Sequence, residues 1–199
     1  EAQAGLVAIH AGDGTLNAGL TALAGWDGAV LVLPGGTMNL VFHRLCGAMT
    51  VAEAIAACAA GQLRPVRPGV IAGAGGLGFA GVMAGPATAW QSVREAMREG
   101  HLLEAAAEAR RALAETLEGQ MVVCREPAFG RRAGYPLLHL VPTADTIRVQ
   151  AYFADHAADY IEQGLAVLRG DFRDGPHTEL GSAAAVTLEG QGGEPLAVL

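Results

Sequence analysis

Two apolar runs near the start of the chain each end in a glycine corner, and a helical pattern follows each corner. Residues 6–10 and 29–33 have the composition of buried strands, and residues 15–24 and 38–45 have apolar positions at helical spacing. Strands that alternate with helices are typical of a parallel sheet with helices packed on it. The first part of the chain therefore predicts an α/β fold.

A change in composition and in the pattern of apolar residues near residue 63 predicts a second domain. A third helix is expected after Thr50, because Glu53 stands at capping-box spacing and Gly61 stands where a left-handed residue ends a helix. Prolines, glycines and short β-like runs follow. We therefore expect a partial α/β domain over residues 1–63 and a β-rich, sandwich-like domain over residues 64–199.

The second part of the chain mixes short strands with two helices. Strands are predicted at residues 70–72, 121–124, 137–141, 147–153 and 184–188, and the final PLAVL also has strand character. Helices are predicted at residues 91–118 and 155–168. The inward positions expected for the long helix are Val93, Met97, Ala106, Ala109, Leu113 and Leu117.

The composition and net charge of the chain argue against several classes of function. Although 51% of the 199 residues are hydrophobic, no apolar run reaches the length of a membrane span, so a soluble globular protein is expected. The formal charge of −7 argues against a nucleic-acid binder. All 13 basic residues are arginine, which excludes a Walker-type phosphate loop with its lysine. Cys46, Cys58 and Cys124 lack the spacing of a disulfide framework or a zinc site.

The first glycine corner, GDGT, has the features of a phosphate site. Gly12 and Gly14 can adopt positive φ and carry no Cβ, so the corner can present N–H groups to an anion at the start of a helix. Asp13 can hold a divalent cation that bridges phosphate oxygens. Thr15 can cap the helix or bind a phosphate.

The second corner, PGGTMN at residues 34–39, repeats this arrangement. If the two strands are neighbours, both corners open at the same rim of the sheet, where ligands of open α/β sheets bind. Asn17 and Asn39 would then face one crevice. Two ordinary strand-to-helix turns are the alternative interpretation.

AGDGTLN followed by LPGGTMN resembles the nucleotide-binding core of the diacylglycerol kinase catalytic family, which includes bacterial lipid kinases and sphingosine kinases. The similarity continues through residues 50–67, and PTADTIRV at residues 142–149 resembles the family segment that ends in DGxLxV.

The resemblance implies an ATP-dependent lipid kinase that transfers the γ-phosphate to a diacylglycerol-like hydroxyl. Its first domain would resemble phosphofructokinase and NAD kinase, and its second would supply the lipid cleft. Asp145 would be the general base, and Asp13 would hold Mg²⁺. The lipid would be met at a membrane surface, which implies a cytoplasmic protein, peripheral at the inner membrane face, with a homodimer as one possible state. The implied ATP-binding residues are Gly12, Asp13, Gly14, Thr15, Asn17, Gly36, Thr37 and Asn39.

Several positions depart from the family pattern. Ala11, Ala18, Leu40 and Thr146 replace a glycine, a glutamate, an aspartate and a glycine. The family's opening strand with Asn-Pro and its closing Asp-Gly-Glu segment have no counterpart, so the chain is expected to be a fragment. Two alternatives stay open: a non-catalytic nucleotide- or lipid-binding relative, and a soluble-substrate kinase of the NAD kinase type, against which PGGTMN argues.

Other motifs have simpler interpretations. GLGFAG at residues 76–81 matches a dinucleotide fingerprint, but the Gly-Pro pair that follows favours a glycine-rich strand turn with Phe79 in the core. His43 is close enough in sequence to Asn39 to approach a bound phosphate, although a structural role is more usual. The pair Arg131 and Arg132 has too few charges for a polybasic patch. Asp171, Asp174 and His177 are interpreted as part of a solvated turn.

Overall fold

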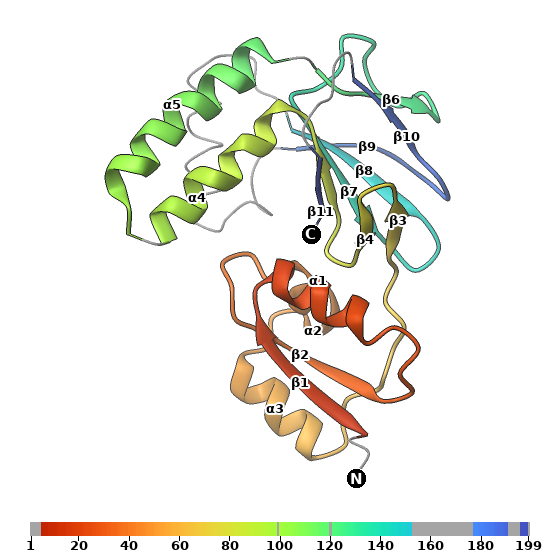
Figure 1. The fold of residues 1–199 in the computed structure, drawn as a ribbon. Coiled ribbons are helices and arrows are strands. Elements are labelled where there is room, and N and C mark those ends of the chain that lie inside the picture. The colour runs from red at the N-terminus through yellow and green to blue at the C-terminus, as the bar shows by residue number, and fades with distance from the viewer. Residues whose placement is uncertain (1–4, 99, 120, 153–176, 191–195, 199) are drawn as a thin grey trace.

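The computed structural model describes residues 5–98, 100–119, 121–152, 177–190 and 196–198. Figure 1 shows a small α/β layer formed by the start of the chain, a group of sheets formed by the rest, and a helical hairpin that projects from these sheets. The predicted helix at residues 155–168 lies outside the described residues.

The N-terminal part consists of two parallel strands and three helices. β1 (Leu6–Ala11) pairs with β2 (Ala29–Pro34) in parallel, in register from Leu6 opposite Ala29 to Ala11 opposite Pro34. The helices are α1 (Asp13–Ala22), α2 (Leu40–Cys46) and α3 (Val51–Ala59). The predicted α/β order is confirmed, with α1 starting two residues earlier than expected and α2 two residues later.

Local chemistry fixes the ends of α3. The Thr50 hydroxyl accepts the N–H of Glu53, and the Glu53 carboxylate accepts the N–H of Thr50, so the predicted capping box is present. Gly61 has a φ of 67°, which confirms the left-handed residue after the helix. Both helix ends therefore follow from the sequence.

The C-terminal part is built on a five-stranded antiparallel sheet in the order β11-β5-β7-β8-β9. Two smaller antiparallel pairs, β3-β4 and β6-β10, accompany it. The strands are β3 (Ile71–Gly73), β4 (Gly76–Gly78), β5 (Val82–Ala84), β6 (Val123–Glu126), β7 (Leu137–Pro142), β8 (Ile147–Tyr152), β9 (Thr178–Ala183), β10 (Thr187–Glu189) and β11 (Leu196–Val198). The final apolar segment is thus a strand, as predicted.

The single long helix predicted at residues 91–118 is wrong. A short 3₁₀ turn, η1 (Pro86–Ala89), leads into α4 (Trp90–Arg98), and α5 (Leu102–Glu118) packs beside α4 as a hairpin (Figure 1). Gly100 has a φ of 79° and ends the first helix.

Because the break at Gly100 resets the helical phase, a pattern projected across it points the wrong residues inward. Before the break, Val93 is buried as expected but Met97 is exposed; after the break, Ala106 is exposed, and the burial of Leu117 lies outside what the structure describes. Ala109 and Leu113 are half-buried. The residues that are buried instead are Ala96, Ala105, Ala112 and Thr116.

The strand predicted at residues 184–188 is also wrong in its bounds. β9 ends at Ala183 and β10 begins at Thr187, so a bend occupies the middle of the expected strand. The small apolar residues of this stretch gave a strand-like pattern although the chain changes sheets there.

The five-stranded sheet has two different faces because side chains alternate along each strand. Leu138, Leu140, Val149 and Ala151 belong to an apolar cluster shared with strand β6. The opposite face carries Leu137 and Tyr152, which belong to a second cluster.

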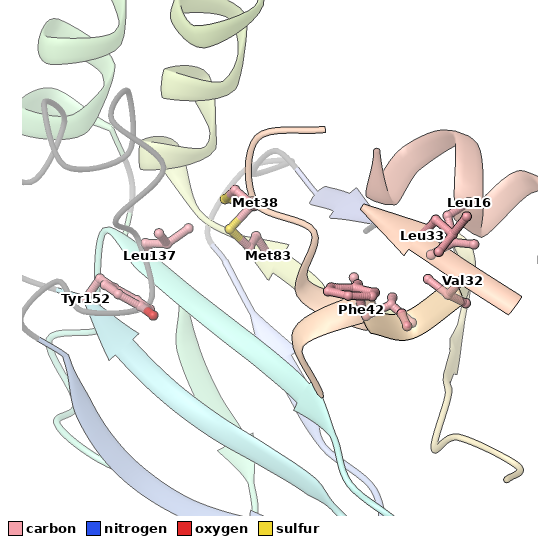
Figure 2. Packing of buried hydrophobic residues seen from close by; sticks show 11 residues of the cluster. Leu16, Val32, Leu33, Met38, Phe42, Met83, Leu137 and Tyr152 are labelled. Carbon is pink, nitrogen blue, oxygen red and sulfur yellow. The ribbon is translucent and has the colours of Figure 1, made fainter. Parts of the chain in front are cut away.

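The second cluster joins the two parts of the chain. Figure 2 shows Met38 of the second glycine corner beside Met83 of β5, with Leu137 and Tyr152 on the same side, and Phe42 between Met83 and Val32. This shared core holds α2 against the sheet. The division into domains at residue 63 stays a prediction.

Among the described residues, no single helix has the length and apolarity to cross a membrane, although α2 and α3 together meet the criterion with a 51° bend between them.

Candidate nucleotide site

The two glycine corners lie side by side at one rim of the small sheet. Parallel pairing places the carboxyl ends of β1 and β2 together, with Ala11 opposite Pro34. A Cβ on Gly36 would lie 2.6 Å from the Cα of Gly12, and a Cβ on Gly35 would lie 2.7 Å from the amide nitrogen of Ala11. The two loops therefore touch through bare backbone, which only glycine allows.

This close approach is the reason for glycine here, rather than the positive φ expected from the sequence. Gly12 has a φ of −73°, and neither Gly14 nor Gly36 has a positive φ. The one left-handed residue of the two corners is Asn39, with a φ of 46°.

The N-terminus of α1 is open to a ligand. Gly12 is the N-cap of this ten-residue helix, and no side chain caps it. The first N–H groups of a helix have no intrahelical partner, and the helix dipole favours an anion there. Gly14 and Thr15 are exposed, and a Cβ on Gly14 would meet no atom within 4 Å. The rim therefore has the donors and the free space that a phosphate group needs.

Asp13 is buried between the two corners and binds the start of α2. One carboxylate oxygen accepts the N–H of Leu40 at 3.0 Å, and the other accepts the N–H of Val41 at 3.2 Å. Asp13 is 9% exposed. The predicted metal ligand is thus also the residue that caps α2, because Leu40 itself has no side-chain acceptor to offer.

Asn39 stabilises its own loop. Its side-chain oxygen accepts the N–H of Gly36 at 2.8 Å, and its amide group donates to the carbonyl of Gly36 at 2.7 Å. Both polar ends of this predicted ATP-binding side chain thus contact Gly36, while Thr37 is exposed beside them. Asn39 shapes the second corner.

Asn17 connects α1 to β4 and to the residue that follows this strand. Its amide group donates to the carbonyl of Leu77 at 2.7 Å, and its oxygen accepts the N–H of Phe79 at 2.9 Å. The GLGFAG segment therefore contacts the N-terminal part directly, and Phe79 packs against the joint apolar cluster. This agrees with the structural interpretation of that motif.

Arg44 of α2 makes a second connection, which no local signal in the sequence predicts. Its guanidinium donates to the carbonyl of Phe79 at 2.6 Å and to that of Pro142 at 3.3 Å, with a longer contact to Gly69 at 3.5 Å. Burial lowers the pKa of this guanidinium, while the Asp13 carboxylate opposes that shift. Phe79 is thus held by Asn17 at its N–H and by Arg44 at its carbonyl.

Asp145 is not brought to the glycine corners by any described contact. It lies in the exposed turn between β7 and β8, and its carboxylate forms no hydrogen bond or ion pair within the described residues. The first residue of β7, Leu137, shares a cluster with Met38, whereas the last, Pro142, contacts Arg44. Asp145 follows at the end of β7 that lies away from Met38.

No group of three or more His, Cys, Asp or Glu side chains able to hold a metal ion occurs in the part of the chain that the structure describes. Asp13 is therefore the carboxylate that the described rim offers to a cation. Mg²⁺ commonly uses one or two carboxylates together with substrate phosphates, so a single carboxylate fits this ion.

Comparison with protein families agrees with these two corners. Residues 1–71, which contain both corners and the helix α3, match the model described as the diacylglycerol kinase catalytic domain. A search of curated proteins found no match. Over residues 1–71, the chain is therefore similar to the diacylglycerol kinase catalytic domain family, and this similarity points to a kinase.

Proposed function

We propose that the chain is an ATP-dependent lipid kinase that transfers the γ-phosphate to a diacylglycerol-like hydroxyl. The observation that carries this proposal is the uncapped N-terminus of α1 directly beside the second glycine corner. It supports a phosphate site built from backbone N–H groups, in a chain that has no lysine. The family match supports phosphate transfer as the reaction.

The phosphates of ATP would lie at Gly14 and Thr15, whose amides begin α1. Gly12 and Gly36 would hold the two corners together around the ligand, since the absence of a Cβ lets their backbones touch. Mg²⁺ held by Asp13 and the phosphates would offset the charge that develops on the transferring group. The Asp13 carboxylate keeps its position through the two α2 amides.

The lipid hydroxyl needs a proton acceptor as it attacks the γ-phosphate. Asp145 is the candidate from the resemblance, and its exposed turn would have to approach the cleft when the lipid binds. Asp145→Asn tests this role, with Asp27→Asn as an exposed control on the other part of the chain. A kcat that is equal in both variants would remove Asp145 from the reaction.

A non-catalytic nucleotide-binding relative is the second candidate. Two observations favour it: Leu40 stands where the family has an aspartate, and both oxygens of Asp13 already accept amide hydrogens. Soluble-substrate phosphorylation is less favoured, because the family match covers the PGGTMN corner.

One experiment separates these candidates. The purified chain is incubated with γ-labelled ATP, Mg²⁺ and mixed micelles containing diacylglycerol, and label in the lipid is measured. Transfer that depends on diacylglycerol is expected. ATP binding by calorimetry without transfer to lipid would select the non-catalytic candidate, and absence of both would overturn the proposal.

A further inference from the structure

His43 of α2 is connected to the second glycine corner, whereas Asp145 is not. The backbone N–H of His43 donates to the carbonyl of Asn39 at 3.1 Å. Its side chain lines a cavity of about 250 Å³ that Leu40 also borders. Leu40 in turn donates its N–H to the Asp13 carboxylate. The His43 ring therefore faces a space that adjoins the proposed site of phosphate transfer.

A hydrogen bond at one ring nitrogen of His43 determines the state of the other. Nδ1 lies 3.1 Å from the carbonyl oxygen of Gly47, the residue that ends α2. Because a carbonyl oxygen can only accept, Nδ1 carries the proton of the neutral ring and donates it. Nε2 then has a free lone pair and can accept a proton. This arrangement prepares His43 to act as a base.

The Nε2 atom of His43 is available to a substrate. It forms no hydrogen bond or ion pair with any residue that the structure describes. The ring packs edge-on against Phe42, with 5.4 Å between the ring centroids, and Phe42 is almost fully buried. His43 itself is half-buried, so a ligand in the cavity can reach it. Gly47 and Phe42 thus hold the ring in place while one nitrogen stays open.

The other titratable or charged groups that line the cavity are Arg44, His139, Tyr152 and His177. Arg44 is a cation that donates to backbone carbonyls and cannot accept a proton. Burial lowers the pKa of His139 to about 4, although its hydrogen bond with Gln150 opposes this shift, so His139 is a weak base. Burial raises the pKa of the Tyr152 hydroxyl, which therefore keeps its proton. His177 stacks on the Tyr152 ring at 5.4 Å and is included in the test below.

We propose that His43 is the general base of the phosphate transfer, in place of Asp145. Nε2 takes the proton of the acceptor hydroxyl while the hydroxyl oxygen forms a bond to the γ-phosphorus. The bond from the γ-phosphorus to the bridging oxygen breaks, and its electron pair leaves with ADP. The imidazolium formed is stabilised by the Gly47 carbonyl and by its place in the last turn of α2, and it then releases the proton to water. This inference rests on the proposed function and adds a catalytic residue to it.

The first test replaces His43 by glutamine, which keeps an N–H donor for the Gly47 carbonyl but has no basic nitrogen. We expect His43→Gln to lower kcat for diacylglycerol about a hundredfold or more, while the KM for ATP changes by less than about twofold. His101→Gln, at an exposed histidine paired with Glu104, is the matched control and should keep the kcat of the parent chain. Urea unfolding of each variant shows whether it is folded in the assay.

The pH profile of kcat separates a base from a structural residue. A histidine base gives an acid limb centred near pH 6.5, whereas a carboxylate base gives one near pH 4. We expect the limb near pH 6.5 in the parent chain and in Asp145→Asn, and its absence in His43→Gln. Imidazole added to His43→Ala should restore part of the lost kcat.

Three results would overturn the inference while the parent chain is active: an unchanged kcat in His43→Gln, an acid limb that persists in this variant, or a limb that disappears in Asp145→Asn or His177→Gln instead. Failure of the proposed function has a different appearance. The parent chain itself would then transfer no phosphate to diacylglycerol, and the role of His43 would be overturned with it.

Discussion

Replacing Asp13 by asparagine should weaken the fold as well as the reaction. The carboxylate accepts the N–H groups of Leu40 and Val41 and thereby attaches the first glycine corner to the start of α2. An asparagine keeps one acceptor oxygen and turns an NH₂ group towards the other N–H. Val41 is 1% exposed, so water does not replace the lost acceptor.

The size of the effect follows from these contacts. Loss of one hydrogen bond to a charged acceptor, with its buried donor left unpaired, costs about 2–3 kcal/mol. The weaker interaction of the neutral side chain with the start of α2 adds about 0.5 kcal/mol. We therefore expect a loss of about 3 kcal/mol, against a total stability of roughly 5–15 kcal/mol for an ordinary domain.

Urea unfolding followed by tryptophan fluorescence measures this loss. Asp27→Asn, at an exposed position, is the control and should change the free energy of unfolding by less than about 0.5 kcal/mol. Activity of Asp13→Asn is then compared under conditions where the variant is folded. Equal stability of the two variants would refute the role of Asp13 at α2, and any activity loss would then be chemical alone.

Three further changes test other contacts. Gly36→Ala places a Cβ 2.6 Å from the Cα of Gly12, so it should separate the corners, lower the urea midpoint and weaken ATP binding in calorimetry; unchanged values would contradict the close contact. Asn17→Ala removes the bonds to Leu77 and Phe79 and should cost about 2 kcal/mol in urea unfolding, with loss below about 0.5 kcal/mol as the contrary result. His139 binds a proton less readily in the folded chain than in the unfolded chain. Its contribution to the free energy of unfolding is therefore fully present above about pH 6.5 and is lost as the pH falls towards about 4. This contribution is about 3 kcal/mol, and the stability of His139→Gln between pH 4 and 6.5 should be less pH-dependent than that of the parent chain.

The N-terminal fold could be predicted because its signals are local. Buried strands, glycine corners and the Thr50 capping box each act within a few residues, and their order restricts the topology to parallel strands. Gly100 is an equally local signal, and missing this helix end shifts the predicted inward face after it, so that Ala106 is exposed where Ala105 is buried.

The contacts that join the N-terminal part to the C-terminal sheets could not be predicted from local sequence patterns. Asn17 lies 60 residues from Leu77, and Arg44 lies 98 residues from Pro142. Nothing in the local pattern shows that an amide in a nucleotide motif holds a distant strand turn. His139 likewise sits in an apolar run, and its partner Gln150 becomes visible only through the strand register.

The most direct test of the central claim is ATP binding at the N-terminus of α1. Isothermal titration with Mg²⁺-ATP is performed on the parent chain, on Gly14→Ala and on Gly5→Ala. Neither alanine meets an atom within 4 Å, so both variants should fold, but only Gly14 lies at the N-terminus of α1, where the phosphate is proposed to bind. We predict that Gly14→Ala weakens ATP binding by about tenfold or more, as expected when a hydrogen-bonded contact is blocked, and that Gly5→Ala matches the parent. Equal ATP affinity in all three proteins would contradict a phosphate site at this helix.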